Sequence, residues 1–287
     1  MNSIPKGSGM GFDKHISESA FLVNESRARN VDLSRDIFAH LWVDDSTQKL
    51  WDDFSREVYP HDEIELSLRN RFFLDCLNSH INADTSIVFV NVGAGFTSYP
   101  FLTNKPCRCI EVDYAHVIDF KRKKIEGWQE EGIVPKRGID YIAADLNNKL
   151  EMEELGSILG SHLKINHSFI LLEGLTYYLE MPVLRNLLAI FSELQVGDSI
   201  LTFDFWTPDS ADHPVFIRFR EFFSKRFGYK EARYNLFDAD FVRSIPGYSV
   251  VEITSIQDLE KVYSKTTFLS DYENILPEQY AVLMKNA

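Results

Sequence analysis

The chain has 287 residues, of which 45% are hydrophobic and 25% are charged, and its formal net charge at pH 7 is -13. These fractions are ordinary for a globular protein, and the length allows one large core with an appended lid. Because nucleic acid attracts basic surfaces, the acidic balance disfavours a nucleic-acid partner.

Neither a metal centre nor a membrane segment is indicated. The three cysteines, Cys76, Cys107 and Cys109, lack the spacing of metal ligands and have no clustered histidine partner. No apolar run reaches the roughly 18 residues of a membrane helix, and the start of the chain lacks the apolar core of a signal peptide. We therefore expect a soluble, cytoplasmic protein with reduced thiols, no metal and no membrane partner.

The N-terminal part of the chain has helical rather than strand character. Residues 1 to about 17 contain Gly and Ser and are expected to be mobile. Three helical stretches follow, at about 19–41 with a possible break near Asn30, at 47–58 and at about 62–80. We therefore assign residues 1–84 to an N-terminal tail and helical cap, and residues 85–287 to the main domain.

An apolar strand at residues 86–92 leads directly into the turn Gly93-Ala94-Gly95. A sharp turn from a first parallel strand into a helix leaves no room for a Cβ atom beside a ligand, which favours Gly. This pattern is typical of a nucleotide-cofactor site, although a purely structural turn is the alternative. The dinucleotide fingerprint needs a third glycine at position 98, where the chain has Ser98, so NAD is disfavoured.

The next three strands each end in an acidic residue. The second strand ends in Glu111-Val112-Asp113, the third leads into Asp145, and the fourth ends at Glu173. Ligands of open α/β sheets bind at the edge where the parallel strands end. These carboxylates are therefore candidate cofactor ligands.

The position of each acid suggests what it binds. Glu111 and Asp113 are expected to accept hydrogen bonds from ribose hydroxyls. Asp145 is expected to accept one from the adenine amine, and Leu146 to cover a face of the ring. Capping of the following helix is the alternative for Asp145.

Strand and helix signals alternate from residue 87 to about residue 205, which predicts right-handed crossovers and a parallel sheet. An insertion at about 207–247 departs from this alternation and carries phenylalanines at helix-like spacing. We expect most of them to pack in the core and only the edge of the stripe to contact a substrate. Residues 248–256 and 279–284 are predicted to form a final antiparallel pair of strands. The phenylalanines are Phe216, Phe219, Phe222, Phe223 and Phe227.

These features together resemble the class I S-adenosylmethionine-dependent methyltransferases. More narrowly, the chain is similar to the leucine carboxyl methyltransferase family, which includes the tetracenomycin-type polyketide O-methyltransferases. The resemblance covers roughly residues 20–205 and depends on residues 90–95, 111–113, 117–122, 145–146 and 173–179. It implies an α/β fold with a doubly wound, mostly parallel seven-stranded Rossmann-like sheet, and S-adenosylmethionine as the cofactor.

The resemblance also implies roles for particular residues. In the family, an arginine in the helix before the first strand binds the cofactor carboxylate; Arg69 lies nearest that place and Arg71 is the alternate. Tyr178 matches the family's tyrosine after the fourth strand. The segment 96–98 lacks the family's aspartate after threonine, so the loop differs there.

Aromatic residues near the ends of the fourth and fifth strands are candidates for the substrate side of the site. They could surround the transferred methyl group and exclude water from it. The alternative is that they pack in the core. Among the histidines, only His213 follows a strand that could reach the cleft. The candidate catalytic residues are therefore His213 and the family-matched Tyr178. The aromatic candidates are Tyr177, Tyr178, Phe205 and Trp206.

The sequence therefore predicts an S-adenosylmethionine-dependent O-methyltransferase that forms a methyl ester on a small-molecule carboxylate of secondary metabolism. A carboxylic acid with a pKa near 4 is ionised at neutral pH and needs no general base, whereas a phenol with a pKa near 10 does. Methylation of a hydroxyl or of a protein C-terminal carboxylate remains open. So does a non-catalytic cofactor-binding subunit, because a fold does not imply a function. The sequence does not indicate the oligomeric state.

Overall fold

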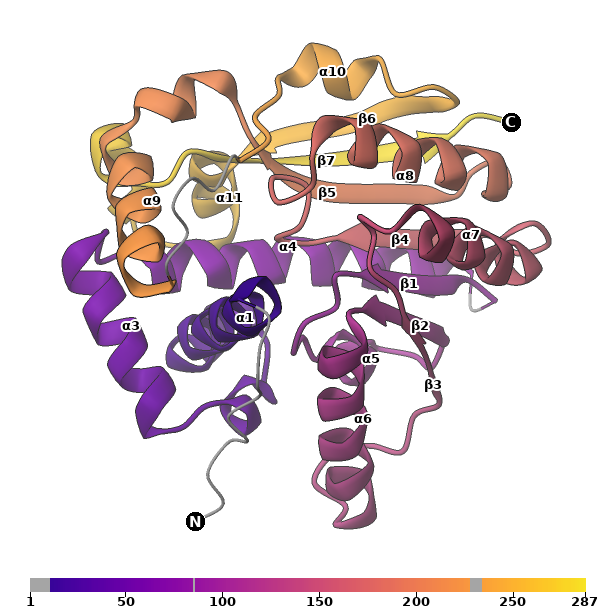
Figure 1. Cartoon of the computed structure of the whole chain (residues 1–287), viewed down its shortest axis with the longest axis horizontal. Helices are drawn as coiled ribbons and strands as arrows, with labels where there is room; N and C mark the ends of the chain where they lie inside the picture. Colours follow the sequence, from indigo (N-terminus) through magenta and orange to yellow (C-terminus); the bar gives the residue numbers. More distant parts are fainter. Residues whose placement is uncertain (1–10, 85, 228–233) are drawn as a thin grey trace.

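The computed structural model describes residues 11–84, 86–227 and 234–287. Its centre is a seven-stranded sheet with the strand order β3-β2-β1-β4-β5-β7-β6 (Figure 1). The first five strands in the chain are parallel, and β7 is antiparallel to both β5 and β6. The strands are β1 (Val88–Val92), β2 (Arg108–Asp113), β3 (Ile139–Ala143), β4 (Ser168–Leu172), β5 (Ile200–Trp206), β6 (Tyr248–Ser255) and β7 (Glu278–Lys285).

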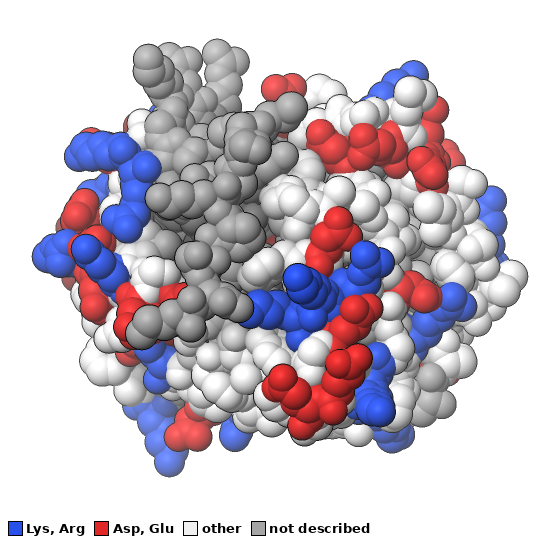
Figure 2. Space-filling view, turned by 60° about the horizontal axis from the view of Figure 1, so that its bottom comes forward, with Lys and Arg blue, Asp and Glu red and all other residues white. Residues whose placement is uncertain are grey.

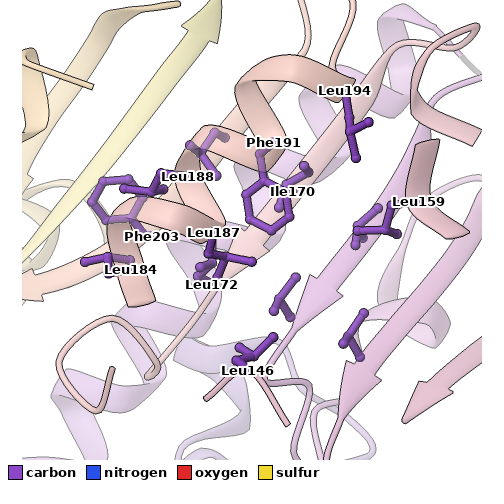
Figure 3. Close-up of a cluster of buried hydrophobic side chains, with 14 of the residues drawn as sticks. Leu146, Leu159, Ile170, Leu172, Leu184, Leu187, Leu188, Phe191, Leu194 and Phe203 are labelled. Atoms are coloured by element: carbon purple, nitrogen blue, oxygen red, sulfur yellow. The ribbon is translucent and has the colours of Figure 1, made fainter. Parts of the chain in front are cut away.

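The central strands β1, β4 and β5 are buried along their whole length. Such strands need apolar residues on both faces because helices cover both sides of the sheet. On one face, α7 (Lys149–Leu163), α8 (Met181–Leu194) and α10 (Ala239–Arg243) pack over strand residues in one hydrophobic cluster, part of which is seen in Figure 3. This arrangement confirms the predicted doubly wound sheet with a final antiparallel pair.

The opposite face is covered mainly by α4 (Asp62–Ala83), with α11 (Ile256–Tyr263) beside it. Buried apolar side chains of α4 pack against Phe89 of β1 and Phe169 of β4. The short helix α5 (Tyr99–Leu102) and the helix α6 (Ala115–Glu130) follow the first two strands. This face carries the helix that brings Arg69 to the ends of the strands.

The N-terminal cap consists of α1 (Gly11–Arg29), α2 (Val31–Ser34), the 3-10 helix η1 (Ala39–Trp42), α3 (Asp45–Glu57) and α4. The predicted break near Asn30 is confirmed, since its backbone leaves the helical region and ends α1 there. The helix α1 begins at Gly11, inside the segment that the composition predicts to be mobile. Residues 1–10 lie outside the described part of the chain.

The insertion between β5 and β6 contains η2 (Pro208–Asp212) and α9 (Pro214–Phe227), and α9 lies beside α3 (Figure 1). Four of the expected phenylalanines are buried in one aromatic cluster with residues of α3, and the side chain of Phe227 is outside the described set. Two short 3-10 helices, η3 (Phe268–Ser270) and η4 (Tyr272–Asn274), precede β7. The buried members are Phe216, Phe219, Phe222 and Phe223.

The surface view in Figure 2 shows acidic and basic side chains lying beside one another. On that face, the negative net charge is not gathered into one patch. Among the described helices, none is both long enough and apolar enough to cross a membrane.

Candidate functional site

A cavity lies at the edge where the parallel strands end. It is bounded by the loops after β1, β2, β3 and β4, by the end of β5, and by side chains of α1, α4 and α9. The sheet order reverses between β1 and β4, and ligands of open α/β sheets bind outside such a switch point. The cavity is therefore the candidate functional site.

The predicted glycine turn forms one wall of this cavity. Gly93 and Gly95 have φ angles of 69° and 44°, which favour glycine over residues with a Cβ atom. A Cβ atom on Gly93 would lie 3.1 Å from the Leu175 side chain, and one on Gly95 would lie 3.5 Å from Ala20 of α1. The turn is thus packed closely on both sides. Phe96, which follows it, stacks on Phe21 and Trp42 in an aromatic cluster.

The two acids of β2 occupy different environments. Asp113 lines the cavity, and its carboxylate accepts hydrogen bonds from the backbone N–H groups of Gly95 and Tyr114, both at 2.7 Å. Burial raises the pKa of Asp113. Glu111 lies two residues deeper in the strand, about 7 Å away along its axis, and does not line the cavity.

Glu111 forms a fully buried ion pair with Lys121 of α6, with 2.8 Å between Oε1 and Nζ. The same ammonium lies 3.4 Å from the carbonyl oxygen of Ala94 and donates to it. The pair therefore supports the glycine turn from behind. Glu111 therefore does not lie where it could make the expected ribose contact. The supporting role of Lys121 was not evident from the sequence.

The two ligands predicted after the third strand, Asp145 and Leu146, differ in their position relative to the cavity. Leu146 lines the cavity together with Ala144 and Asn147. Asp145 is half-buried and is not part of the lining; its Oδ1 accepts a hydrogen bond from the backbone N–H of Asn147 at 2.9 Å. The following helix is capped by Asn148 rather than by Asp145.

Glu173, at the end of β4, is the centre of a buried polar network. Its carboxylate accepts hydrogen bonds from Arg27 Nη2, from Arg69 Nε at 2.8 Å and from the Tyr99 hydroxyl at 2.7 Å. Burial acts to raise the pKa of Glu173, but the two guanidinium groups lower it below its usual value. Glu173 is therefore an ionised carboxylate held between two arginines.

Arg69 joins the ends of three strands to α4. Its Nη1 lies 3.1 Å from Asp204 of β5 and 3.1 Å from Glu278 of β7, in addition to the bond from Nε to Glu173. The side chain is only 4% exposed and lines the cavity. Arg71, the alternate, pairs with Asp75 at 2.8 Å and does not line the cavity.

Arg27 of α1 is a site residue that the sequence analysis missed. It is fully buried and lines the cavity, yet within the described residues its Nε and Nη1 have no hydrogen-bond partner. Asn24, one turn earlier, also lines the cavity, and its Oδ1 likewise lacks a partner there. Helical spacing places residues 20, 23, 24 and 27 on one face of α1, and this face lines the cavity. That spacing is the feature of the sequence that could have identified Arg27.

Two of the aromatic candidates, Phe205 and Trp206, are neighbours on β5 and point to opposite faces of the sheet. Trp206 lines the cavity with Tyr177 and Tyr178, and its ring stacks on Tyr177 with 3.8 Å between centroids. Phe205 points to the opposite face, where it stacks on Phe237 in the core. The substrate-side role expected of Phe205 therefore does not agree with its position.

His213 is also not part of the cavity lining. It is buried, and its Nδ1 accepts a hydrogen bond from the backbone N–H of Val215 at 3.2 Å, at the start of α9. It thus helps to begin this helix rather than facing the cavity. From the same helix, Phe219 and Phe223 do line the cavity, as expected for the edge of the phenylalanine stripe.

Comparison with known proteins extends these observations. A family model described as leucine carboxyl methyltransferase matches residues 20–191. This span includes Arg27, Arg69 and the strand ends up to Glu173. Among curated proteins, no sequence matches the chain significantly.

Two solved structures match over nearly the whole chain. A DUF574 family protein from Streptomyces avermitilis is 13% identical, with a TM-score of 0.62, and the match covers 94% of this chain and 97% of that one. A protein from Thermobifida fusca that is proposed to be a methyltransferase is 12% identical, with a TM-score of 0.64, and the match covers 99% and 100%. At these identities the likeness shows the fold alone.

The buried pair behind the glycine turn leads to a stability prediction. The substitution Lys121→Met leaves the Glu111 carboxylate buried without a counter-charge, so we expect the free energy of unfolding to fall by about 3–5 kcal/mol. The double substitution Glu111→Leu with Lys121→Met should recover most of this loss, because no buried charge remains. Urea unfolding measures both values, and a loss below about 1 kcal/mol for the single variant would match an exposed pair instead.

Proposed function

The chain belongs to the leucine carboxyl methyltransferase family, and we propose that it is an O-methyltransferase that forms a methyl ester on a small-molecule carboxylate of secondary metabolism. The family membership makes it an S-adenosylmethionine-dependent methyltransferase. The observation that carries the proposal is the cavity itself, in which the glycine turn, Asp113 and two buried arginines meet.

We propose one orientation for the cofactor in this cavity. Gly93, Ala94 and Gly95 allow a close backbone approach, and Asp113 is positioned to bind the ribose hydroxyls. Although Asp113 already accepts two backbone hydrogen bonds, a carboxylate offers about four lone-pair sites, so it can also accept from the ribose. Leu146 packs on the adenine in this proposal, with Asp145 beside it in the turn.

The amino-acid end of the cofactor then lies toward Arg27, Arg69 and Glu173. Arg69 already contacts three carboxylates, whereas Nε and Nη1 of Arg27 have no hydrogen-bond partner within the described residues, with Nη1 3.9 Å from the buried Asp36 carboxylate. Unpaired buried donors are costly, and a ligand carboxylate would satisfy them. We therefore assign the cofactor carboxylate mainly to Arg27, with Arg69 and Glu173 holding that guanidinium in place.

The methyl acceptor is proposed to lie on the aromatic side of the cavity, near Tyr177, Tyr178 and Trp206. The sulfonium methyl is already activated, so positioning the nucleophile behind it accounts for most of the catalysis, about 7–11 kcal/mol. The described lining contains no histidine or lysine. A carboxylate acceptor suits this environment because it is ionised without help.

The first prediction concerns Arg27. The substitution Arg27→Lys keeps the positive charge but removes the planar fork of donors, so S-adenosylhomocysteine should bind at least about tenfold more weakly. Calorimetric titration measures this affinity. Arg71→Lys is the matched control, because Arg71 lies on α4 outside the lining, and it should leave the affinity unchanged. Equal affinity in the wild type and in Arg27→Lys would remove Arg27 from the proposed cofactor site.

The second prediction concerns the product. With a substrate found by screening carboxylic acids, a methyl group transferred from labelled S-adenosylmethionine should be released as volatile methanol in mild base. Methyl esters hydrolyse under these conditions, whereas methyl ethers do not. Label that stays in solution would reject the ester and favour methylation of a hydroxyl.

A further inference from the structure

Two carboxylates of α4 line the cavity without a basic side chain to balance them. Asp62 and Glu65 are 5% and 1% exposed and lie one turn apart. Asp62 accepts a hydrogen bond from the Ser26 hydroxyl at 2.6 Å, and Glu65 accepts one from the Tyr59 hydroxyl. Within the described residues, neither forms an ion pair with Lys, Arg or His.

The cavity as a whole has more acidic than basic side chains. Its described lining includes two arginines and no lysine or histidine, and Arg69 already pairs with Glu173 and Glu278. An acceptor that carries only a carboxylate would therefore leave the two acids on the α4 side without a cationic partner. An acceptor that also carries a positive group would not. The lining carboxylates are Asp62, Glu65, Asp113, Glu173 and Glu278.

A second, independent feature of the cavity also indicates a ligand. Trp206 is 1% exposed and lines the cavity, and its Nε1 has no hydrogen-bond partner among the described residues. An indole N–H can only donate, so its missing partner is an acceptor atom such as a carboxylate oxygen. The other aromatic rings of the cavity lining favour an apolar body and tolerate a nearby cation. These rings are Phe54, Tyr59, Tyr177, Phe219 and Phe223.

We propose that the methyl acceptor is an amino-carboxylic acid with an aromatic body, whose protonated amine binds Asp62 and Glu65 and whose carboxylate accepts a hydrogen bond from Trp206 Nε1. This inference rests on the proposed function, because it names the class of acid to be methylated. Across the described residues, no group of His, Cys, Asp and Glu is arranged to hold a metal ion, which favours an amine over a metal cation as the positive group.

The protonation of the two acids gives the site a measurable property. Burial raises the pKa of Asp62 to about 7 and raises that of Glu65 well above its usual value, with Glu278 adding to both shifts. Arg69 lowers both values, the Ser26 hydroxyl lowers that of Asp62, the Tyr59 hydroxyl lowers that of Glu65, and Glu63 raises that of Asp62. An arriving ammonium group favours the ionised carboxylates, so its binding should release protons near neutral pH.

The test uses protein saturated with S-adenosylhomocysteine, so that the cofactor's own charges stay constant. The probes are two matched pairs: L-phenylalanine with 3-phenylpropanoate, and L-tryptophan with indole-3-propanoate. In calorimetric titrations we expect the amine-bearing member of a pair to bind at least tenfold more tightly. Titration in two buffers with different ionisation enthalpies should show proton release for that member alone, a result that needs no variant.

Two variants test the residues. Asp62→Asn with Glu65→Gln keeps the shapes and can keep the bonds from Ser26 and Tyr59, and it should abolish the preference for the amine while S-adenosylhomocysteine binds as before. Trp206→Phe should weaken the binding of both members of a pair by the same factor. Asp75→Asn, which changes a carboxylate of α4 outside the lining, is the control and should change neither affinity.

Several results would overturn the inference: equal affinities within each pair, no binding of any probe, no proton release, or a preference that survives in the Asp62→Asn and Glu65→Gln variant. Failure of the proposed function would appear differently. In that case S-adenosylhomocysteine itself would not bind to the wild-type protein.

Discussion

The shared carboxylate of Glu173 is the interaction on which the rest of the site depends. It receives hydrogen bonds from α1 through Arg27, from α4 through Arg69 and from α5 through Tyr99. Arg69 then reaches β5 and β7 through Asp204 and Glu278. One buried network therefore fixes the helical cap against the ends of three strands, and the cavity exists because these elements meet there.

Such a network is stable only when it is complete. Removing one partner of a buried ion pair leaves a charge that neither water nor protein stabilises, at a cost of about 3–5 kcal/mol. This constraint separates the two arginines. The Nε and Nη1 atoms of Arg69 contact three carboxylates of the protein, so this side chain holds the strand ends and the cap together. Arg27 donates to Glu173 and its Nη1 lies 3.9 Å from Asp36, but within the described residues its Nε and Nη1 form no hydrogen bond.

The sequence was informative where local patterns decide the structure. Apolar runs that end in acids located the strands, and the Gly93-Ala94-Gly95 turn located the edge of the sheet where the cavity lies. It was less informative where a contact joins distant segments. Nothing near Glu111 in the chain indicates that Lys121 turns back to pair with it, and the position of Asp62 beside Ser26 depends on how α1 crosses α4.

The surplus of carboxylates also bears on the direction of the reaction. S-adenosylmethionine carries a positive sulfonium group, and methyl transfer to a carboxylate removes this positive charge together with the negative charge of the acceptor. When carboxylates such as Asp62, Glu65 and Glu278 are ionised, they stabilise a sulfonium beside them, whereas the neutral thioether gains nothing from them. Ionised acids in the lining would therefore favour the cofactor over its demethylated product. An ammonium group on the acceptor would still balance these acids after transfer.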